Sequence, residues 1–165
     1  MIKKKPNEVV YHVLSNHINH YRQGKKIFKT DYDSHMITIT VFTHFLYGTL
    51  NPSHELYQHE NLDWGKMFPL VKGLLKDKKK YSDKLSIFSI AQMLDIPKET
   101  VRRKVDALCK KKLLVYSVRE GVTIGDNWEL LVKKIAPKDL LSLDKAIKVI
   151  SKNVGLSEFL NDIKK

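Results

Sequence analysis

The stretch from residue 86 to residue 111 constrains the fold most, because it holds two short helical patterns at a fixed offset. Each pattern places its apolar residues on one helical face. These residues are Ile90, Ala91 and Leu94 in the first pattern, and Val101, Val105 and Leu108 in the second. Between them, Asp95 tolerates the left-handed conformation of a tight turn, and Pro97 suits the first position of a new helix. The stretch therefore predicts a helix-turn-helix.

A short β-hairpin is predicted directly after the second helix. Residues 113–116 form an apolar run typical of a strand, residues 118–121 read as a turn, and residues 122–124 return as a second strand. Leu85 is a candidate for a short third strand that pairs with this hairpin. A helix-turn-helix followed by such a hairpin is the arrangement of a winged helix, in which the hairpin is the wing.

Residues 86–125, about a quarter of the chain, resemble the winged-helix DNA-binding domains of bacterial transcription regulators. The best match is to the cyclic-AMP-receptor type, whose second helix opens Ser-Arg-Glu-Thr-Val-x-Arg; here residues 97–103 read Pro-Lys-Glu-Thr-Val-Arg-Arg. Residues 108–114, Leu-Cys-Lys-Lys-Lys-Leu-Leu, resemble the segment that leads into the family's wing. The chain departs from the family at Asp95, where glycine is usual, and at Lys104, where an apolar residue is usual.

The resemblance implies a recognition helix at residues 97–111, whose N-terminal residues enter the DNA major groove. By match to the family pattern, the base-reading residues are Lys98, Glu99 and Arg103. Arginine can bind guanine at two acceptors, and glutamate can accept a hydrogen bond from cytosine. Contacts with phosphates or with the minor groove are assigned to Ser86, Thr100, Arg102 and Arg119. The alternative is that all these side chains form a solvated helix face and a solvated turn.

The net charge of +12 is concentrated in two regions of the chain. Residues 1–29 carry seven Lys or Arg and one acid, and residues 64–125 carry fifteen and six. Residues 30–63, in contrast, carry five acids and no Lys or Arg. A basic surface supplies the sequence-independent part of the affinity for nucleic acid by releasing counterions. Because the basic excess coincides with the helix-turn-helix, nucleic-acid binding is favoured over solubility alone.

Two helices are predicted before residue 62. Residues 6–23 form an amphipathic pattern, with Gly24 as its stop. Residues 34–50 are apolar, and Ser34 could cap a helix there. Their β-branched run at 37–41 also fits a strand, although the length of the segment favours a helix. Four aromatic residues could line an effector pocket or, as such a stripe more often does, a core: Phe42, Phe45, Tyr47 and Tyr57.

Further helices are predicted on both sides of the helix-turn-helix. Residues 63–77 would supply the first helix of the winged-helix domain, and residues 128–135 suggest a short helix after the wing. A clearer helix covers residues 137–154, with apolar residues at spacings of three, four, three and four, which is a seam of the coiled-coil kind. The seam consists of Leu140, Leu143, Ile147, Ile150 and Val154. Residues 156–163 mark a last amphipathic turn or two.

Catalytic and metal-binding motifs are scarce. No Gly-rich phosphate loop, nucleophile elbow or His-Glu-x-x-His motif is present, so neither an enzyme nor a cofactor is predicted. His17 and His20 could share a metal, but no Cys or carboxylate cluster accompanies them, so no metal is predicted. The single Cys109 is expected to be structural, in a reducing cytoplasm. Neither a membrane span nor a signal peptide is predicted.

The sequence thus predicts a mainly α-helical protein with a small β wing: a winged helix-turn-helix with helical N- and C-terminal extensions. The expected domains are residues 1–62 for dimerisation or effector binding, residues 63–125 for DNA binding, and residues 126–165 for dimerisation. This layout resembles the multiple-antibiotic-resistance class of regulators, which implies a homodimer, held by the terminal helices, on a near-palindromic DNA duplex.

The function expected from these features is a cytoplasmic, sequence-specific transcription regulator that binds double-stranded DNA. The identity of any small-molecule effector stays unknown. Two alternatives remain open. One is a winged helix that contacts another protein, and the other is an RNA-binding or nonspecific nucleic-acid-binding protein.

Overall fold

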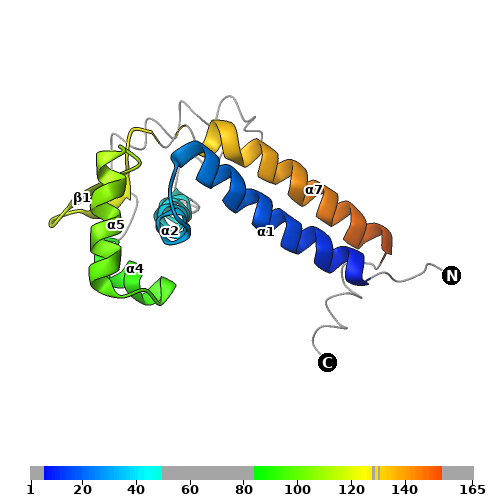
Figure 1. The fold of residues 1–165 in the computed structure, drawn as a ribbon, viewed down its shortest axis with the longest axis horizontal. Coiled ribbons are helices and arrows are strands. Elements are labelled where there is room, and N and C mark those ends of the chain that lie inside the picture. Colours follow the sequence, from blue (N-terminus) through cyan, green and yellow to red (C-terminus); the bar gives the residue numbers. More distant parts are fainter. Residues whose placement is uncertain (1–5, 50–83, 128, 130, 154–165) are drawn as a thin grey trace. The chain divides into compact units, whose positions relative to one another are not determined.

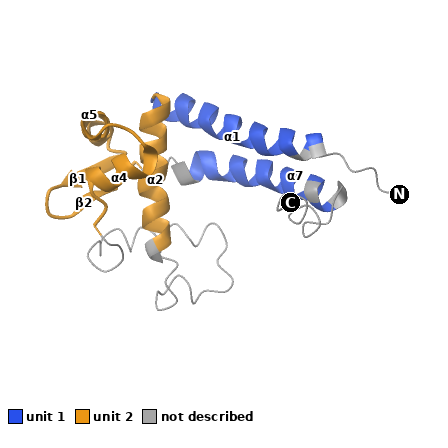
Figure 2. Ribbon diagram, turned by 90° about the horizontal axis from the view of Figure 1, so that it is seen from below, with its two compact units in different colours: residues 1–30, 130–165 blue, residues 31–129 orange. Residues whose placement is uncertain are grey.

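The structure, a computed structural model, describes residues 6–49, 84–127, 129 and 131–153 of the chain. These residues are mainly helical, with one small antiparallel sheet of two strands (Figure 1). The predicted fold class is confirmed at this level. The chain divides into two compact units, distinguished by colour in Figure 2. Unit 1 comprises residues 1–30 and 130–165, and unit 2 comprises residues 31–129.

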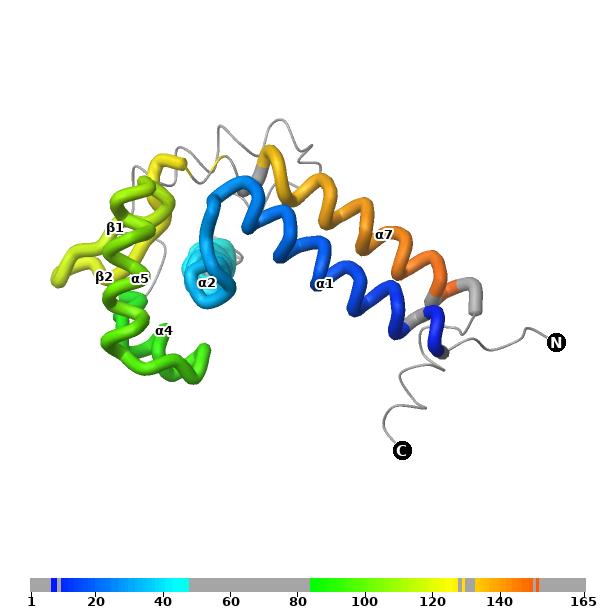
Figure 3. Tube along the Cα trace, in the orientation of Figure 1, coloured from blue at the N-terminus to red at the C-terminus, as the bar shows by residue number. Residues whose placement is uncertain are grey.

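Unit 1 is built around two long helices that lie side by side and run antiparallel (Figure 3). They are α1 (Pro6–Phe28) and α7 (Ala136–Asn153). The segment η2 (Leu131–Ile135), a short π-helix, leads into α7 and also contacts α1. The predicted short helix near residues 128–135 and the long helix at 137–154 therefore both have counterparts.

The predicted end of the first helix at Gly24 is wrong. α1 continues through this glycine, which is buried, to Phe28. The left-handed residue that ends a helix is instead Lys29, at φ 50°, and its N–H donates to the carbonyl of Lys25 at 2.9 Å. Two lysines in the last turn, Lys25 and Lys26, complement the negative end of the helix dipole. The stop is therefore set by the turn after the helix rather than by glycine.

Unit 2 contains the predicted helix-turn-helix stretch and one further helix. Its elements are α2 (Tyr32–Thr49), α4 (Ile87–Leu94), α5 (Lys98–Lys110), β1 (Leu114–Ser117) and β2 (Gly121–Ile124). α2 contacts α4, α5 and β2, and α5 contacts α4 and β1. The core side chains are apolar and at most 2 % exposed: Ile37, Val41, Ile90, Val101, Val105, Leu108, Leu114 and Val122.

α2 resolves the choice between helix and strand at residues 34–50 in favour of a helix. Ile37 and Val41 lie one turn apart and are both buried, so the β-branched run supplies one apolar stripe of the helix. The hydroxyl of Thr38 donates to the Ser34 carbonyl at 2.8 Å, which satisfies a buried polar group. Ser34 is not the cap: its own N–H donates to the Asp31 carboxylate at 2.9 Å, and Asp31 precedes the helix.

The predicted helix at 63–77 and the predicted domain boundary at 62/63 lie outside the described residues. Residues 156–163 and Tyr57 lie outside them as well. Within the described part of unit 2, α2 packs against α4, α5 and β2 and so covers their shared core. Residues 31–49, expected in the N-terminal region, therefore fold in the same compact unit as the helix-turn-helix stretch.

The two strands form the predicted hairpin. Leu114 pairs with Ile124, and Ser117 pairs with Gly121, in antiparallel register. Leu85 does not form the predicted third strand, since the sheet of the described residues has two strands. It contacts the hairpin through one backbone bond, in which the N–H of Val122 donates to the Leu85 carbonyl at 2.8 Å. This bond joins the hairpin to the segment that leads into α4.

Candidate nucleic-acid interface

α4 begins with an N-cap at Ser86. The N–H of Ser89 donates to the Ser86 hydroxyl oxygen at 3.0 Å, and the two hydroxyl groups lie 2.8 Å apart. Ser86 has the extended conformation of an N-cap residue, with φ −86° and ψ 158°. Its hydroxyl is therefore used locally to start the helix. Either hydroxyl can be the donor in the contact between Ser86 and Ser89, and when Ser89 donates, the Ser86 O–H is left to donate to a phosphate.

The turn between α4 and α5 has the left-handed residue that the sequence predicted. Asp95 has φ 51° and ψ 45°, and its N–H donates to the Ala91 carbonyl. The N–H of Ile96 donates to the same carbonyl at 3.1 Å. A non-glycine residue in this region is strained by about 1 kcal/mol relative to glycine, and aspartate tolerates it better than most. The turn directs α5 across α4, with which it packs.

α5 has one buried face and one solvent-facing side. Val101, Val105 and Leu108 are 1 % exposed or less and fix the helix to the core. Four of the predicted DNA-contacting side chains on this helix are exposed: Lys98, Glu99, Arg102 and Arg103. Thr100 is half-buried. The three predicted base readers thus lie on exposed positions in the first two turns.

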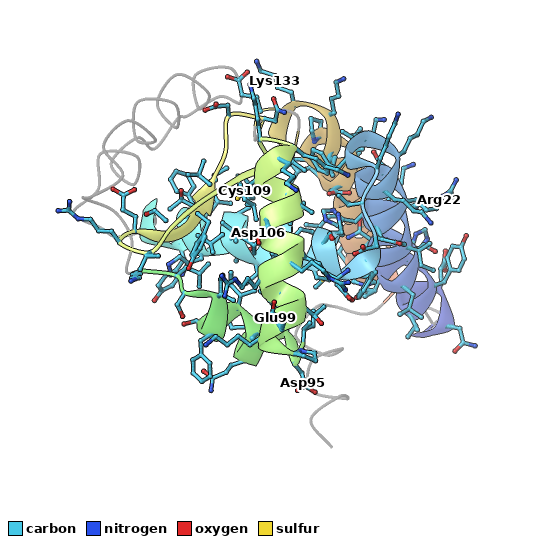
Figure 4. The ribbon with its side chains drawn as sticks, turned by 60° about the vertical axis from the view of Figure 1, so that its left-hand side comes forward. Arg22, Asp95, Glu99, Asp106, Cys109 and Lys133 are labelled. Atoms are coloured by element: carbon cyan, nitrogen blue, oxygen red, sulfur yellow. The ribbon has the colours of Figure 1, made fainter. Side chains whose placement is uncertain are left out.

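Two acids interrupt the basic surface of α5. Glu99 and Asp106 lie along the helix in Figure 4, and both are exposed. Arg102 and Arg103 lie three and four residues after Glu99, and Asp106 follows them at similar spacing, so the four charges are neighbours on a helix surface. Such alternation lowers the total positive potential of the helix. The position of Asp106 on this helix follows from the sequence, but a negative charge there does not fit the pattern of a DNA contact.

The hairpin presents an exposed turn. Val118 is 80 % exposed, and Arg119 and Glu120 are exposed beside it. The N–H of Glu120 donates to the Ser117 hydroxyl at 3.0 Å, and the Lys84 ammonium donates to the Val118 carbonyl at 2.6 Å. These bonds hold the backbone of the turn that carries the exposed Arg119.

Gly121 is required where the hairpin turns back. Its φ is +80°, and a Cβ atom at this position would lie 2.4 Å from the Leu85 carbonyl oxygen. The same carbonyl accepts the N–H of Val122, so the backbone of residue 85 cannot withdraw without breaking that bond. Any residue type other than glycine at position 121 would therefore displace the backbone of Leu85.

The basic C-terminal end of α5 is closed by backbone bonds. Lys112 adopts φ 56°, and the N–H of Leu113 donates to the Leu108 carbonyl at 3.1 Å, which is the pattern of a left-handed helix end. The side chain and backbone of Asn127 donate to the Lys111 and Lys112 carbonyls, each at 2.9 Å. The cluster of three lysines at residues 110–112 is thus exposed on an ordered backbone.

Lys104, the other departure from the family pattern, forms an ion pair that sequence reasoning missed. Its ammonium lies 2.8 Å from Asp31 Oδ1 and 3.4 Å from Asp33 Oδ2, at the start of α2. The Lys104 hydrogen bond is the largest cause that lowers the pKa of Asp31, to about 2. The same bond raises the pKa of Lys104. Asp31 is 73 residues away in the chain, so no local pattern predicted the contact.

Cys109 has the environment of a structural residue, as expected. It is half-buried near the end of α5 (Figure 4). Burial and then the nearby Asp106 carboxylate raise the pKa of its thiol. A thiol is a weaker nucleophile than a thiolate, so this environment disfavours redox reactivity.

The predicted dimerisation seam lies on α7 in unit 1. Leu140, Leu143 and Ile147 are 51 %, 45 % and 54 % exposed. The side chain of Ile150 and the whole of Val154 lie outside the described residues. The seam side chains that the structure describes are therefore apolar and accessible to solvent.

The predicted histidine pair on α1 separates. His17 is exposed, whereas His20 is half-buried and contacts the Asp139 carboxylate of α7 through its Nδ1. Among the described residues, no group of three or more His, Cys, Asp or Glu side chains could hold a metal ion. In the same part of the chain, no helix is long and apolar enough to cross a membrane.

Comparison of the chain with protein-family models, with curated proteins and with solved structures finds no match. The function is therefore inferred from local geometry and charge.

Proposed function

We propose that this protein is a winged helix-turn-helix transcription regulator that binds double-stranded DNA with sequence preference. The observation that carries the proposal is the two-sided structure of α5. Its apolar face is buried in the core, while Lys98, Glu99, Arg102 and Arg103 are exposed on the same helix. A helix held in this way can lie in the major groove, because its outward side chains need no rearrangement to meet base edges.

The proposed contacts follow from the chemistry of each side chain. Arg103 would bind the two major-groove acceptors of a guanine, and Glu99 would accept from the amino group of a cytosine. Lys98, in the first turn, would donate to a base acceptor. Thr100 and Arg102 would contact the phosphates that position the helix.

The hairpin and the start of α4 would add contacts outside the major groove. Arg119 lies at an ordered and exposed turn, which suits insertion into a narrow minor groove with its enhanced negative potential. Ser86, at the N-terminus of α4, would contact a phosphate with its hydroxyl. The net basic charge of residues 64–125 supports the nonspecific part of binding.

We further propose that the protein acts as a homodimer through unit 1. Two apolar stripes support this. One is the α7 seam of Leu140, Leu143 and Ile147, and the other is an α1 stripe of Val10, Leu14 and Ile18, which are 50 %, 57 % and 57 % exposed. Exposed apolar stripes of this kind mark association surfaces more often than free surface.

The two stripes lie at the same level along the helix pair. His20 of α1 contacts Asp139 of α7, and the two helices run antiparallel. Both helices rise about 1.5 Å per residue, so a step back along α1 from His20 matches a step forward along α7 from Asp139. Residues 10–18 of α1 therefore lie level with residues 141–149 of α7. A second copy related by a two-fold axis would therefore bring the stripe of one chain against the seam of the other.

The experiment that tests the function is selection from a random duplex library at near-physiological salt, followed by sequencing. An enriched two-fold-symmetric site is the expected result, with half-sites about one DNA turn, roughly 34 Å, apart. An enriched single half-site would retain the regulator and remove the dimer. Retained DNA without enrichment would indicate a nonspecific nucleic-acid-binding protein, and no retained DNA would refute the proposal.

A second candidate is a winged helix that contacts another protein. Two exposed apolar side chains of α4 favour it, Phe88 at 54 % and Met93 at 61 %. The acidic side chains of Glu99 and Asp106 on α5 fit a mixed-charge protein surface as well as a DNA contact. Capture of a protein partner that is lost on Phe88→Ala, without any DNA binding, would support this candidate.

A further inference from the structure

Lys104 is a cation in the middle of the proposed recognition helix that does not face the solvent side. Its immediate neighbour Arg103 is exposed, and its other neighbour Val105 is fully buried. The side chain of Lys104 is 15 % exposed, which is low for a lysine. Its ammonium reaches across to α2, where it contacts the carboxylates of Asp31 and Asp33 at 2.8 and 3.4 Å.

Asp31 joins two elements through one oxygen atom. Its Oδ1 accepts the N–H of Ser34 in the first turn of α2 and also the ammonium of Lys104 in α5. The carbonyl of Asp31 accepts the N–H of His35 at 3.0 Å, so the residue is held at the helix start by backbone and side chain together. The N-terminus of a helix favours negative charge, which adds to the stability of the Asp31 carboxylate at this position. The contact is therefore an ion pair on a fixed backbone.

We propose that Asp31 and Asp33 are positioning residues that hold Lys104 against α2 and withhold its charge from DNA. The proposal rests on the proposed DNA-binding function of α5. An ammonium on a flexible stem of four carbons could otherwise reach a phosphate beside Arg103. With Lys104 neutralised, the cations that remain to meet DNA from the middle of α5 are the neighbouring arginines, Arg102 and Arg103. The two acids thus remove one sequence-independent contact and leave the base-reading contacts in place.

The salt dependence of DNA binding measures how many phosphate contacts the protein makes, and so whether Lys104 makes one. Each neutralised phosphate contributes about 0.9 to the slope of log Kd against log salt concentration. Lys104→Met retains the aliphatic stem of the side chain, and we expect it to leave the slope unchanged. Arg102→Met is the matched control on the same helix, and its slope should fall by about 0.9.

The double substitution Asp31→Asn with Asp33→Asn should have the opposite effect. The released Lys104 would add a phosphate contact, so the slope steepens by about 0.9 and binding to an unrelated duplex tightens by roughly two- to tenfold at near-physiological salt. Because the loss of two negative charges could itself strengthen binding, Lys104→Met is added as a third change. We expect the triple variant to lose the steeper slope. A slope reduced in Lys104→Met as much as in Arg102→Met would overturn the proposal, as would a double variant whose slope is that of the unchanged protein.

A second measurement uses the free protein and does not depend on DNA binding or on any variant. Lysines are acylated with a limiting amine-reactive ester and the rates are read by mass spectrometry. In the free protein, Lys104 should react at least several-fold more slowly than the exposed Lys98, and added DNA should not slow the reaction of Lys104 further. Equal rates in the free protein would refute the ion pair, and additional protection of Lys104 by DNA would show a phosphate contact. If the protein retains no DNA, the proposed function fails while slow acylation of Lys104 still supports the ion pair.

Discussion

The two units differ in what lies between their helices. In unit 2, α2, α4, α5 and the hairpin meet through aliphatic side chains such as Ile37, Ile90 and Leu108, which are almost fully buried. In unit 1, the contact between α1 and α7 includes His20 and Asp139, and several aliphatic side chains of the two helices are exposed, among them Leu14 and Leu140. The first arrangement removes apolar surface from water, whereas the second leaves much of it in contact with water.

The polar character of the α1 face is seen in its half-buried residues. Asn16, His20 and Gln23 lie at spacings of four and three, on one helical face. The side-chain oxygens of Asn16 and Gln23 are buried without a hydrogen-bond partner among the described residues. Buried polar groups contribute little net stability but can select one pairing of helices. The comparison teaches that the helices of unit 2 enclose a shared aliphatic core, whereas α1 and α7 of unit 1 leave apolar side chains exposed.

The largest expected effect is on the core of unit 2. Leu108→Ala removes a side chain that is 1 % exposed and should lower the free energy of unfolding by about 3 kcal/mol. Met93→Ala, at an exposed position of α4, is the control and should change it by less than about 0.5 kcal/mol. Urea denaturation followed by circular dichroism measures both. Equal effects of the two substitutions would contradict the assignment of the core.

The second prediction concerns the apolar stripes of unit 1. Leu14→Gln and Leu143→Gln should each weaken the proposed homodimer at least about tenfold in Kd, because a buried apolar contact is lost. Sedimentation equilibrium of the full chain measures the constant. Val118→Gln, at the exposed hairpin turn, is the control and should leave it unchanged. A dimer that survives both leucine substitutions would place the interface elsewhere.

A smaller effect is expected at the end of α5, where two neighbouring lysines should respond with opposite signs. Lys112 has φ 56°, so Lys112→Gly should raise the free energy of unfolding by about 1 kcal/mol. Lys110 lies within the helix, so Lys110→Gly should lower it by about 1 kcal/mol. Thermal melts of the two variants decide the matter, and a loss of stability in both would argue against the left-handed helix end.

The smallest effect is the pH dependence of the contact between α2 and α5. The pKa of Asp31 is lowered from 3.8 to about 2, mainly by Lys104. A carboxyl group with a lowered pKa stabilises the fold above its unfolded pKa, and this contribution is lost as pH falls from about 4 towards 2. Because Asp31 is 61 % exposed, the contribution is about 1 kcal/mol or less. Asp31→Asn should flatten the stability profile between pH 4 and pH 2, relative to the unchanged protein measured in the same buffers.

Much of unit 2 was predictable because its signals are local. The Ser86 cap, the left-handed Asp95, the hairpin at residues 114–124 and the buried face of α5 each depend on residues close together in the chain. Hydrophobic periodicity and turn chemistry act over the same short distances. The sequence by itself also determined the helix at 136–153 and its apolar seam.

Only the tertiary structure decided what these elements pack against. It placed α2 beside α5. It also paired Lys104 with Asp31 and His20 with Asp139, which lie 73 and 119 positions apart in the chain. Periodicity identifies an apolar face but does not name the surface that covers it, and a charge pattern does not state which charges are neutralised. For this reason the exposed α7 seam and the ion pair of Lys104 with Asp31, rather than the predicted helices themselves, are what the three-dimensional structure adds.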